Sequence, residues 1–198
     1  MGEKMTKKER RIATGKAIFD AAVIEFGENG YSHTTLTAIA KRAGVSQGLV
    51  SQNFGNKNGL FLKVVENIDQ LLFDYTDKEL GGRSFTMNNL VSIILKRLNV
   101  MAKDNPAGFQ LMFSLSSGVD IPAQCQARIA YRYKHSPAGK LFNEAVENGQ
   151  LPKGNGFDFM HIFVQMAVTI VYFSVLSGMK HPDERYFLKA MHYKETAN

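Results

Sequence analysis

The clearest alternation of apolar and polar positions begins near residue 56 and continues to about residue 79. Its apolar residues follow one another at steps of one, three or four, which places them on one face of a helix. They are Leu60, Phe61, Val64, Val65, Ile68, Leu71, Leu72 and Tyr75. Asn56 can cap this helix at its start. A helix of this length predicts a rigid connection between a small N-terminal domain and a second domain.

Two short segments before this helix have a different pattern. Thr37–Gly44 starts on a hydroxyl residue, ends on a glycine and has one narrow apolar face. Ser46 can cap a second helix over about Gln47–Asn53, which exposes amides and hydroxyls and keeps only Leu49 or Val50 for the core. Two such helices joined by a glycine-containing turn predict a helix-turn-helix. Its second helix would lie in the major groove of DNA, where amides can bind base edges.

The rest of the chain also has helical spacing. A first helix is predicted over about Lys8–Asn29, and a break in the pattern follows the long helix at Gly81–Gly82. Further helices are predicted at about Met87–Lys103, Pro106–Ser116, Pro122–Lys134, Pro137–Asn148, Phe157–Ser177 and Pro182–Tyr193. Val168–Val175 has a composition that favours β structure, but its surroundings favour a buried helix. The predicted fold class is therefore all-α.

The residues in and around the two short helices follow a known motif. In order, they are Thr35, Ile39, Ala40, Ala43, Gly44, Val45, Ser46, Gly48, Phe54, Lys57 and Leu60. On these residues the chain resembles the DNA-binding half of the TetR family of bacterial transcription regulators. Upstream matches extend the resemblance to about Arg11–Phe61, and they are Ala21, Ala22, Phe26, Gly30 and Tyr31. The resemblance implies a three-helix DNA-binding domain at residues 1–56 and a larger helical ligand-binding and dimerisation domain at residues 57–198.

Four positions depart from the usual family pattern. Ser51 stands where the family usually has a tyrosine that contacts phosphate, and Asn53 stands where it has histidine or tyrosine. Asn58 replaces a common glutamate, and Glu25 replaces a leucine in the first helix. The loss of the tyrosine is compatible with weaker DNA affinity, with a different operator or with drift away from DNA binding. Altered specificity is the favoured interpretation, because the scaffold residues and Lys57 remain.

Composition and charge agree with a cytoplasmic DNA-binding protein. The net charge is +6; residues 1–60 hold nine Lys and Arg against five Asp and Glu, and residues 61–198 hold fifteen against thirteen. A basic N-terminal part fits binding to a polyanion, although a merely soluble basic surface explains the charge equally well. Lys4–Arg11 could reach the DNA backbone or serve as a solvated leader. A single cysteine, Cys125, indicates a reducing compartment. The N-terminal residues do not have the pattern of a secretory signal.

One C-terminal segment leaves two interpretations open. Phe159–Met179 has 21 residues without Asp, Glu, Lys or Arg, which is long enough to span a bilayer. A dimer interface would also explain it, because one face would meet its own domain and the other a partner. The resemblance implies such an interface, formed by the last two helices of each subunit. We therefore expect a homodimer and no membrane span.

The sequence contains no recognisable set of catalytic residues, so we expect no catalytic site, no metal and no cofactor. The five histidines are scattered, and none is at metal-ligand spacing from a carboxylate or cysteine. Phenylalanine and methionine are frequent in the C-terminal part; each alone is best explained by core packing, but together they could line an apolar cavity. The resemblance implies a small-molecule inducer there. The candidate residues are Met101, Phe109, Met112, Phe113, Tyr131, Phe142, His161 and Gln165.

The predicted function is that of a repressor released from a palindromic operator by an apolar or aromatic ligand. Backbone contacts are expected from Thr35, Ser46, Gly48, Ser51 and Lys57. Base readout is expected from Gln47, Gln52 and Asn53, whose amides prefer adenine. The alternatives are a small-molecule-binding or interaction protein with a vestigial helix-turn-helix, and a membrane-anchored protein.

Overall fold

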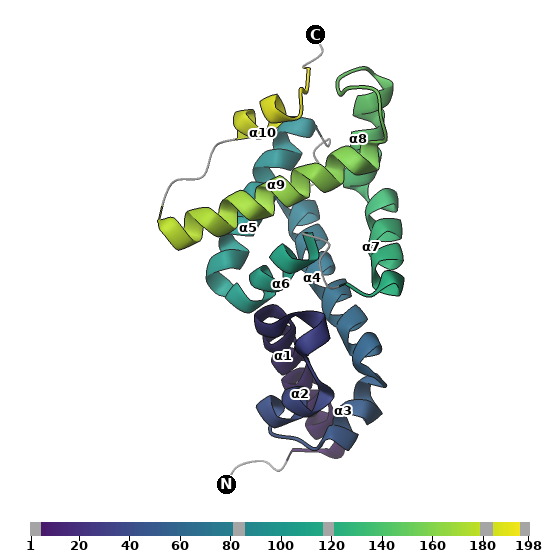
Figure 1. Ribbon diagram of the computed structural model, residues 1–198, viewed down its shortest axis with the longest axis vertical. Helices are drawn as coiled ribbons and strands as arrows, with labels where there is room; N and C mark the ends of the chain where they lie inside the picture. Colours follow the sequence, from purple (N-terminus) through teal and green to yellow (C-terminus); the bar gives the residue numbers. More distant parts are fainter. Residues whose placement is uncertain (1–4, 81–85, 117–120, 179–183, 195–198) are drawn as a thin grey trace.

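The computed structural model describes residues 5–80, 86–116, 121–178 and 184–194. Within these ranges the chain forms ten α-helices and no strand (Figure 1). The helices are α1 (Lys7–His33), α2 (Leu36–Ala43), α3 (Gln47–Phe54), α4 (Lys57–Leu80), α5 (Met87–Asp104), α6 (Pro106–Ser116), α7 (Ala123–His135), α8 (Pro137–Glu147), α9 (Gly156–Ser177) and α10 (Glu184–Ala190). The predicted all-α fold, with a helix-turn-helix domain followed by a helical domain, is confirmed. The predicted break at Gly81–Gly82 and the predicted helix start at Pro182 lie outside the described residues.

The head of the molecule consists of α1, α2, α3 and the first turns of α4. Its core is apolar: Ile18 of α1, Ile39 of α2, Val50 of α3 and Leu60 of α4 are all fully buried. α1 loses helical geometry at Gly30, whose φ is 71°, before a last turn that ends at His33. This interruption comes directly after the position at which the sequence predicts the helix to end.

The two short helices have the predicted caps. The hydroxyl of Thr35 accepts a hydrogen bond from the amide of Ala38 at 3.1 Å, and that of Ser46 accepts one from the amide of Leu49 at 3.3 Å. Gly44 ends α2 in the left-handed region, with φ 68° and ψ 31°. Because glycine adopts this conformation without strain, the chain turns sharply and α3 begins three residues later.

α4 belongs to both parts of the molecule. Its Phe61 meets the rings of Phe26 and Tyr31, with ring centroids 4.9 and 5.0 Å apart, and so completes the core of the head. The helix then continues into the rest of the molecule, called the body here, which consists of α5–α10 and the remainder of α4. There it packs on α5. α6 packs closely on α1, which gives the head a second contact with the body.

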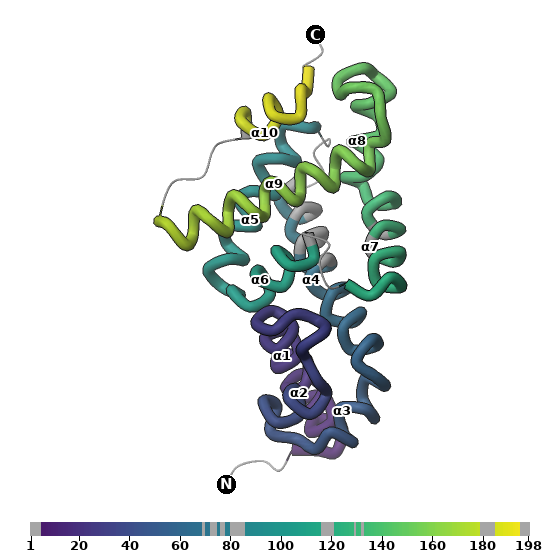
Figure 2. The backbone as a smooth tube through the Cα atoms, in the orientation of Figure 1, coloured from purple at the N-terminus to yellow at the C-terminus, as the bar shows by residue number. Residues whose placement is uncertain are grey.

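The body is built around α5, which contacts α4, α6, α8, α9 and α10. The tube in Figure 2 shows α9 crossing α5 at the end of the molecule that also holds α8 and α10. α9 packs on α5, α6 and α8 through buried side chains that include Phe163, Ala167, Val168 and Val171. The segment with β-favouring composition is thus helical, and the predicted buried face is present.

α9 also has an outer apolar face. Ile162, Phe173, Val175 and Leu176 are 48, 56, 46 and 66% exposed. In the part of the chain that the structure describes, α9 is the helix that is long and apolar enough to cross a membrane, with a mean hydropathy of 1.9. Only 28% of that window is buried within the molecule, so an apolar surface is left uncovered.

α7 lies beside α4 and packs mainly on α8 (Figure 1). Among its side chains that the structure describes, Cys125 is the buried one. Burial raises the pKa of the Cys125 thiol, because the apolar surroundings disfavour the thiolate.

Candidate nucleic-acid interface

One face of α3 is polar and open to solvent. Gln47, Gly48, Ser51 and Gln52 are exposed, whereas Val50 on the other side of the helix is fully buried. The buried valine holds α3 against the head, so the polar face has a fixed direction. Four of the eight residues that the sequence predicts for DNA binding lie together on this one surface.

α2 positions the start of α3. The hydroxyl of Thr37 donates a hydrogen bond to Oε1 of Gln47 at 2.8 Å. Both side chains are exposed, so this contact orients the Gln47 amide at the surface without removing it from solvent. The contribution of Thr37 was missed by sequence reasoning, because nothing in the spacing shows which hydroxyl of α2 faces α3.

Asn53 is placed differently from the other predicted base-reading residues. Its Nδ2 donates to the carbonyl of Leu49 one turn earlier, at 2.8 Å, and the side chain is half-buried. Its Oδ1 faces α1, where a Cβ built on Gly15 would lie 4.0 Å away. The amide therefore folds back on its own helix instead of joining Gln52 on the outer surface.

Lys57 is also engaged within the protein. Its ammonium donates to the carbonyls of Tyr31 at 2.9 Å and Thr34 at 3.0 Å, and it lies 4.2 Å from the centre of the Tyr31 ring. These contacts join the first turn of α4 to the segment between α1 and α2. A phosphate contact by Lys57, as the sequence predicts, would require the ammonium to leave these carbonyls.

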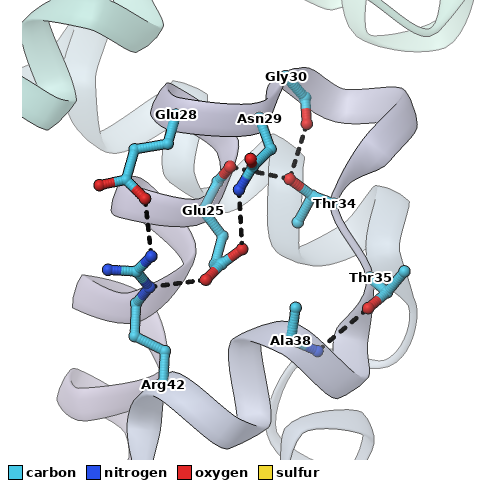
Figure 3. A network of polar contacts seen from close by, with 8 residues as sticks. All are labelled: Glu25, Glu28, Asn29, Gly30, Thr34, Thr35, Ala38 and Arg42. Carbon is cyan, nitrogen blue, oxygen red and sulfur yellow. Dashed lines mark hydrogen bonds and ion pairs between the residues drawn. The ribbon is translucent and has the colours of Figure 1, made fainter.

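A network of charged side chains holds α2 against α1 (Figure 3). Nε of Arg42 donates to Glu25 at 2.6 Å, and a terminal guanidinium nitrogen of Arg42 donates to Glu28 at 2.7 Å. Asn29 donates a further hydrogen bond to the Glu25 carboxylate at 3.0 Å. The hydrogen bond that Arg42 donates to Glu25, together with the negative charges of Glu25 and Glu28, raises the pKa of Arg42. Glu25, which departs from the family pattern, is thus paired rather than left as an isolated buried charge.

Thr34 strengthens the same junction. Its buried hydroxyl contacts the carbonyls of Glu25 at 2.9 Å and Gly30 at 2.7 Å (Figure 3). It therefore stabilises the kinked end of α1, while Thr35 next to it is exposed and caps α2.

Exposed basic residues extend the surface beyond α3. Lys7, Lys8, Arg10 and Arg11 lie in the first turns of α1, at the end of the molecule that also holds α2 and α3 (Figure 1). A capping box between Thr6 and Glu9 starts this helix. The hydrogen bond from the backbone of Thr6 lowers the pKa of Glu9. The predicted basic arm is therefore helical from Lys7 onward.

The residues predicted to line a ligand cavity divide into buried and exposed groups. Met101, Phe109, Met112 and Phe142 are buried in the core of the body. Phe113 stacks on Tyr172 with ring centroids 4.5 Å apart. The three polar candidates, Tyr131, His161 and Gln165, are all exposed.

An open cleft of about 1050 Å³ lies elsewhere, between α4, α7 and the head. Of the eight predicted residues, Tyr131 is the one that lines it. In the described ranges no three His, Cys, Asp or Glu side chains are grouped as a metal site would need.

Comparison with known proteins agrees with the geometry of the head. Residues 18–64, from within α1 into α4, match the sequence model of the bacterial regulatory proteins of the tetR family. The head of this chain, over residues 18–64, is thus a TetR-family domain. The match covers the helix-turn-helix and the helices that support it, which are the elements that hold the polar face of α3 outward.

Two relatives and one solved structure are similar to this chain. It is 23% identical over 138 residues to the fatty acid metabolism regulator protein of Bacillus subtilis, covering 69% of this chain and 70% of that one. It is 39% identical over 80 residues to the HTH-type transcriptional regulator BetI of Burkholderia thailandensis, of which it spans 41%. A TetR family transcription regulator from Marinobacter aquaeolei shares the fold, with a TM-score of 0.66, 20% identity, and coverage of 93% of this chain and 96% of that one.

Proposed function

We propose that this protein is a ligand-responsive transcriptional repressor that binds a palindromic DNA operator as a homodimer. The observation that carries the proposal is the outward polar face of α3, fixed by capped helices within a TetR-family head. The major groove of DNA is wide enough for such a helix, and amide side chains can bind base edges there.

The exposed residues of α3 make different kinds of contact with DNA. Gln47 and Gln52 read bases, and their amides favour adenine because each can donate to N7 and accept from N6. Ser51 contacts the DNA where the family usually has a longer tyrosine, so its reach is shorter. A Cβ built on Gly48 would meet no protein atom within 4 Å, which supports a close approach of the DNA backbone at this position.

Backbone contacts position the head on the duplex. Thr35 and Ser46 lie at the exposed N-termini of α2 and α3, where helix ends favour phosphate. The basic first turns of α1 add attraction for the duplex that does not depend on its sequence. Asn53 and Lys57 are left out of this set, because their polar groups already bind the carbonyls of Leu49, Tyr31 and Thr34.

The outer face of α9 forms the dimer interface. Its exposed apolar side chains include Phe173 and Leu176, and a second copy of the chain would cover them. Burial of this face in a dimer accounts for the apolar length of α9 in a soluble, cytoplasmic protein. Two heads related by such an interface would meet half-sites on one face of the DNA, separated by one or more helical turns.

The inducer is proposed to be a small apolar or aromatic molecule. One relative carries the name of a fatty acid metabolism regulator, which is compatible with an apolar ligand. Binding to the body would change the spacing of the two heads through α4 and the α1–α6 contact. A coupling free energy on the order of 1–3 kcal/mol is enough to release the operator.

Selection of bound fragments from random duplex DNA tests the proposal. The purified protein should enrich an inverted repeat, because a symmetric dimer presents the same face of α3 twice. Val50→Asp serves as the negative control. It removes the buried anchor of α3 and should enrich no motif, because the head no longer holds α3 in place. Failure of the wild-type protein to enrich any motif would favour the alternative, a ligand-binding protein with a vestigial helix-turn-helix.

A further inference from the structure

We propose that the open cleft between α4, α7 and the head binds an aromatic monoanion. The bound ligand directly contacts the C-terminal end of α3, the helix that faces DNA in the proposed function. The cleft has a volume of about 1050 Å³, at the upper end of the size of small-molecule sites. The effect of the ligand on DNA binding rests on the proposed function, whereas binding of the ligand to the cleft does not.

Aromatic rings form the part of the cleft nearest the head. Phe19 of α1 and Phe54 of α3 line it and are both only half-buried. Tyr131 adds a third ring from α7 and is 65% exposed. A flat aromatic body can pack against an uncovered ring face or edge of this kind.

Charged groups of α4 and α7 complete the lining. Glu66 bridges two cations, with Lys63 at 3.3 Å and Arg128 at 2.6 Å. These three side chains are the charged residues of the lining, so its net charge is +1. One anionic group on a ligand would balance this charge. Arg128 is suited to bind it, because its guanidinium has five N–H donors and its side chain is 59% exposed.

α7 can adjust to an occupant more easily than the other walls. It packs mainly on α8, and Cys125 is its one buried side chain among those described. The ion pair between Arg128 and Glu66 links α7 to α4 across the cleft. A ligand anion that shares Arg128 with Glu66 would therefore keep this link while it fills the space.

The walls come from both parts of the molecule, and this connects occupancy to DNA binding. Phe54 is the last residue of α3 in the head, whereas Arg128 belongs to α7 in the body. A ligand that touches both has a different affinity for each position of the head relative to the body. Occupancy must then shift that position, and DNA must in turn change the affinity for the ligand.

A matched pair of fluorescent probes tests the cleft in the DNA-free, full-length protein. The probes are 1-anilinonaphthalene-8-sulfonate, an aromatic monoanion, and N-phenyl-1-naphthylamine, its neutral counterpart. Replacing Ala127, an exposed cleft residue, by Trp should obstruct the cleft and weaken saturable binding of both probes. Arg128→Gln should weaken the anion about tenfold and leave the neutral probe unchanged. Lys140→Gln, which removes an exposed charge from α8, is the control and should change neither.

The outcomes separate this site from the others on the molecule. If all variants bind both probes like the wild type, the probes occupy another surface, such as the outer face of α9, and the proposal is overturned. If Arg128→Gln weakens both probes equally, the assignment of a monoanion is wrong. If the cleft binds as expected but the protein selects no operator, the proposed function fails while the ligand site stands. If both hold, the sulfonate probe should change operator affinity at least fivefold in the wild type and not in Ala127→Trp.

Discussion

The charged residue at position 25 shows how a single side chain can depart from a family pattern without loss of the fold. Glu25 is 8% exposed on α1, where an apolar residue would be expected. Arg42 of α2 and Asn29 of α1 bind its carboxylate, and Arg42 also reaches Glu28. A buried carboxylate that accepts hydrogen bonds from both of these partners can fasten α2 to α1.

Two conservative substitutions, one at each acidic partner of Arg42, test this role. Glu25→Gln should lower the free energy of unfolding by about 2 kcal/mol, since it weakens charge-assisted hydrogen bonds at a buried site. Glu28→Gln removes an exposed carboxylate from the same guanidinium and should cost less than about 1 kcal/mol. Urea unfolding followed by circular dichroism measures both. Equal losses would show that the burial of Glu25 contributes nothing.

Sequence reasoning succeeded at the residue scale where helical period decides exposure, and failed where distant partners do. The spacing of α3 left Leu49 or Val50 for the core, of which Val50 is the buried one, and it placed Gln52 on the surface. It could not show that Asn53 folds back beside Gly15, or that Lys57 binds the carbonyl of Tyr31. Those contacts depend on how α1 packs over α3 and α4, which no local pattern contains.

At the scale of elements, the contact between α1 and α6 is the closest link between head and body. A Cβ built on Gly27 of α1 would lie 2.5 Å from the carbonyl oxygen of Ala107 in α6. The absence of a side chain at Gly27 is therefore what allows the two helices to approach. The sequence predicted both helices, with α6 starting at Pro106 and with α1 ending at Asn29 instead of His33, but the close approach has no signal in either helix alone.

Two glycine substitutions in α1 separate helix propensity from packing. Gly27→Ala should lower the free energy of unfolding by about 1–3 kcal/mol, because its Cβ would overlap the backbone of α6. Gly15→Ala should raise it by about 0.5–1 kcal/mol, since its Cβ meets no atom closer than 4.0 Å and alanine favours the helix. Both are measured by urea unfolding. A stabilising effect of Gly27→Ala would mean that α6 yields freely, and that the contact does not fix the head.

On the scale of the whole molecule, the head is connected to the body by the continuous helix α4 and by α1 packed on α6. The two-part organisation could be predicted from the sequence, because the long amphipathic helix and the motif of the head are both local features. The cleft could not, since its walls come from α1, α3, α4 and α7. Four of the eight residues chosen for a ligand cavity are buried in the core, because Phe and Met fill a helical interior as readily as they line a pocket.

The central claim is that the outward face of α3 reads DNA sequence, and one measurement tests it most directly. Fragments are selected from random duplex DNA with the wild-type protein, with Gln52→Ala, and with Gln126→Ala as a control on an exposed glutamine of α7. Gln52→Ala should lose base preference at one symmetry-related pair of positions and keep the rest of the inverted repeat, while Gln126→Ala should select the wild-type motif. If Gln52→Ala also selects the wild-type motif unchanged, α3 does not read bases through this residue and the account is contradicted.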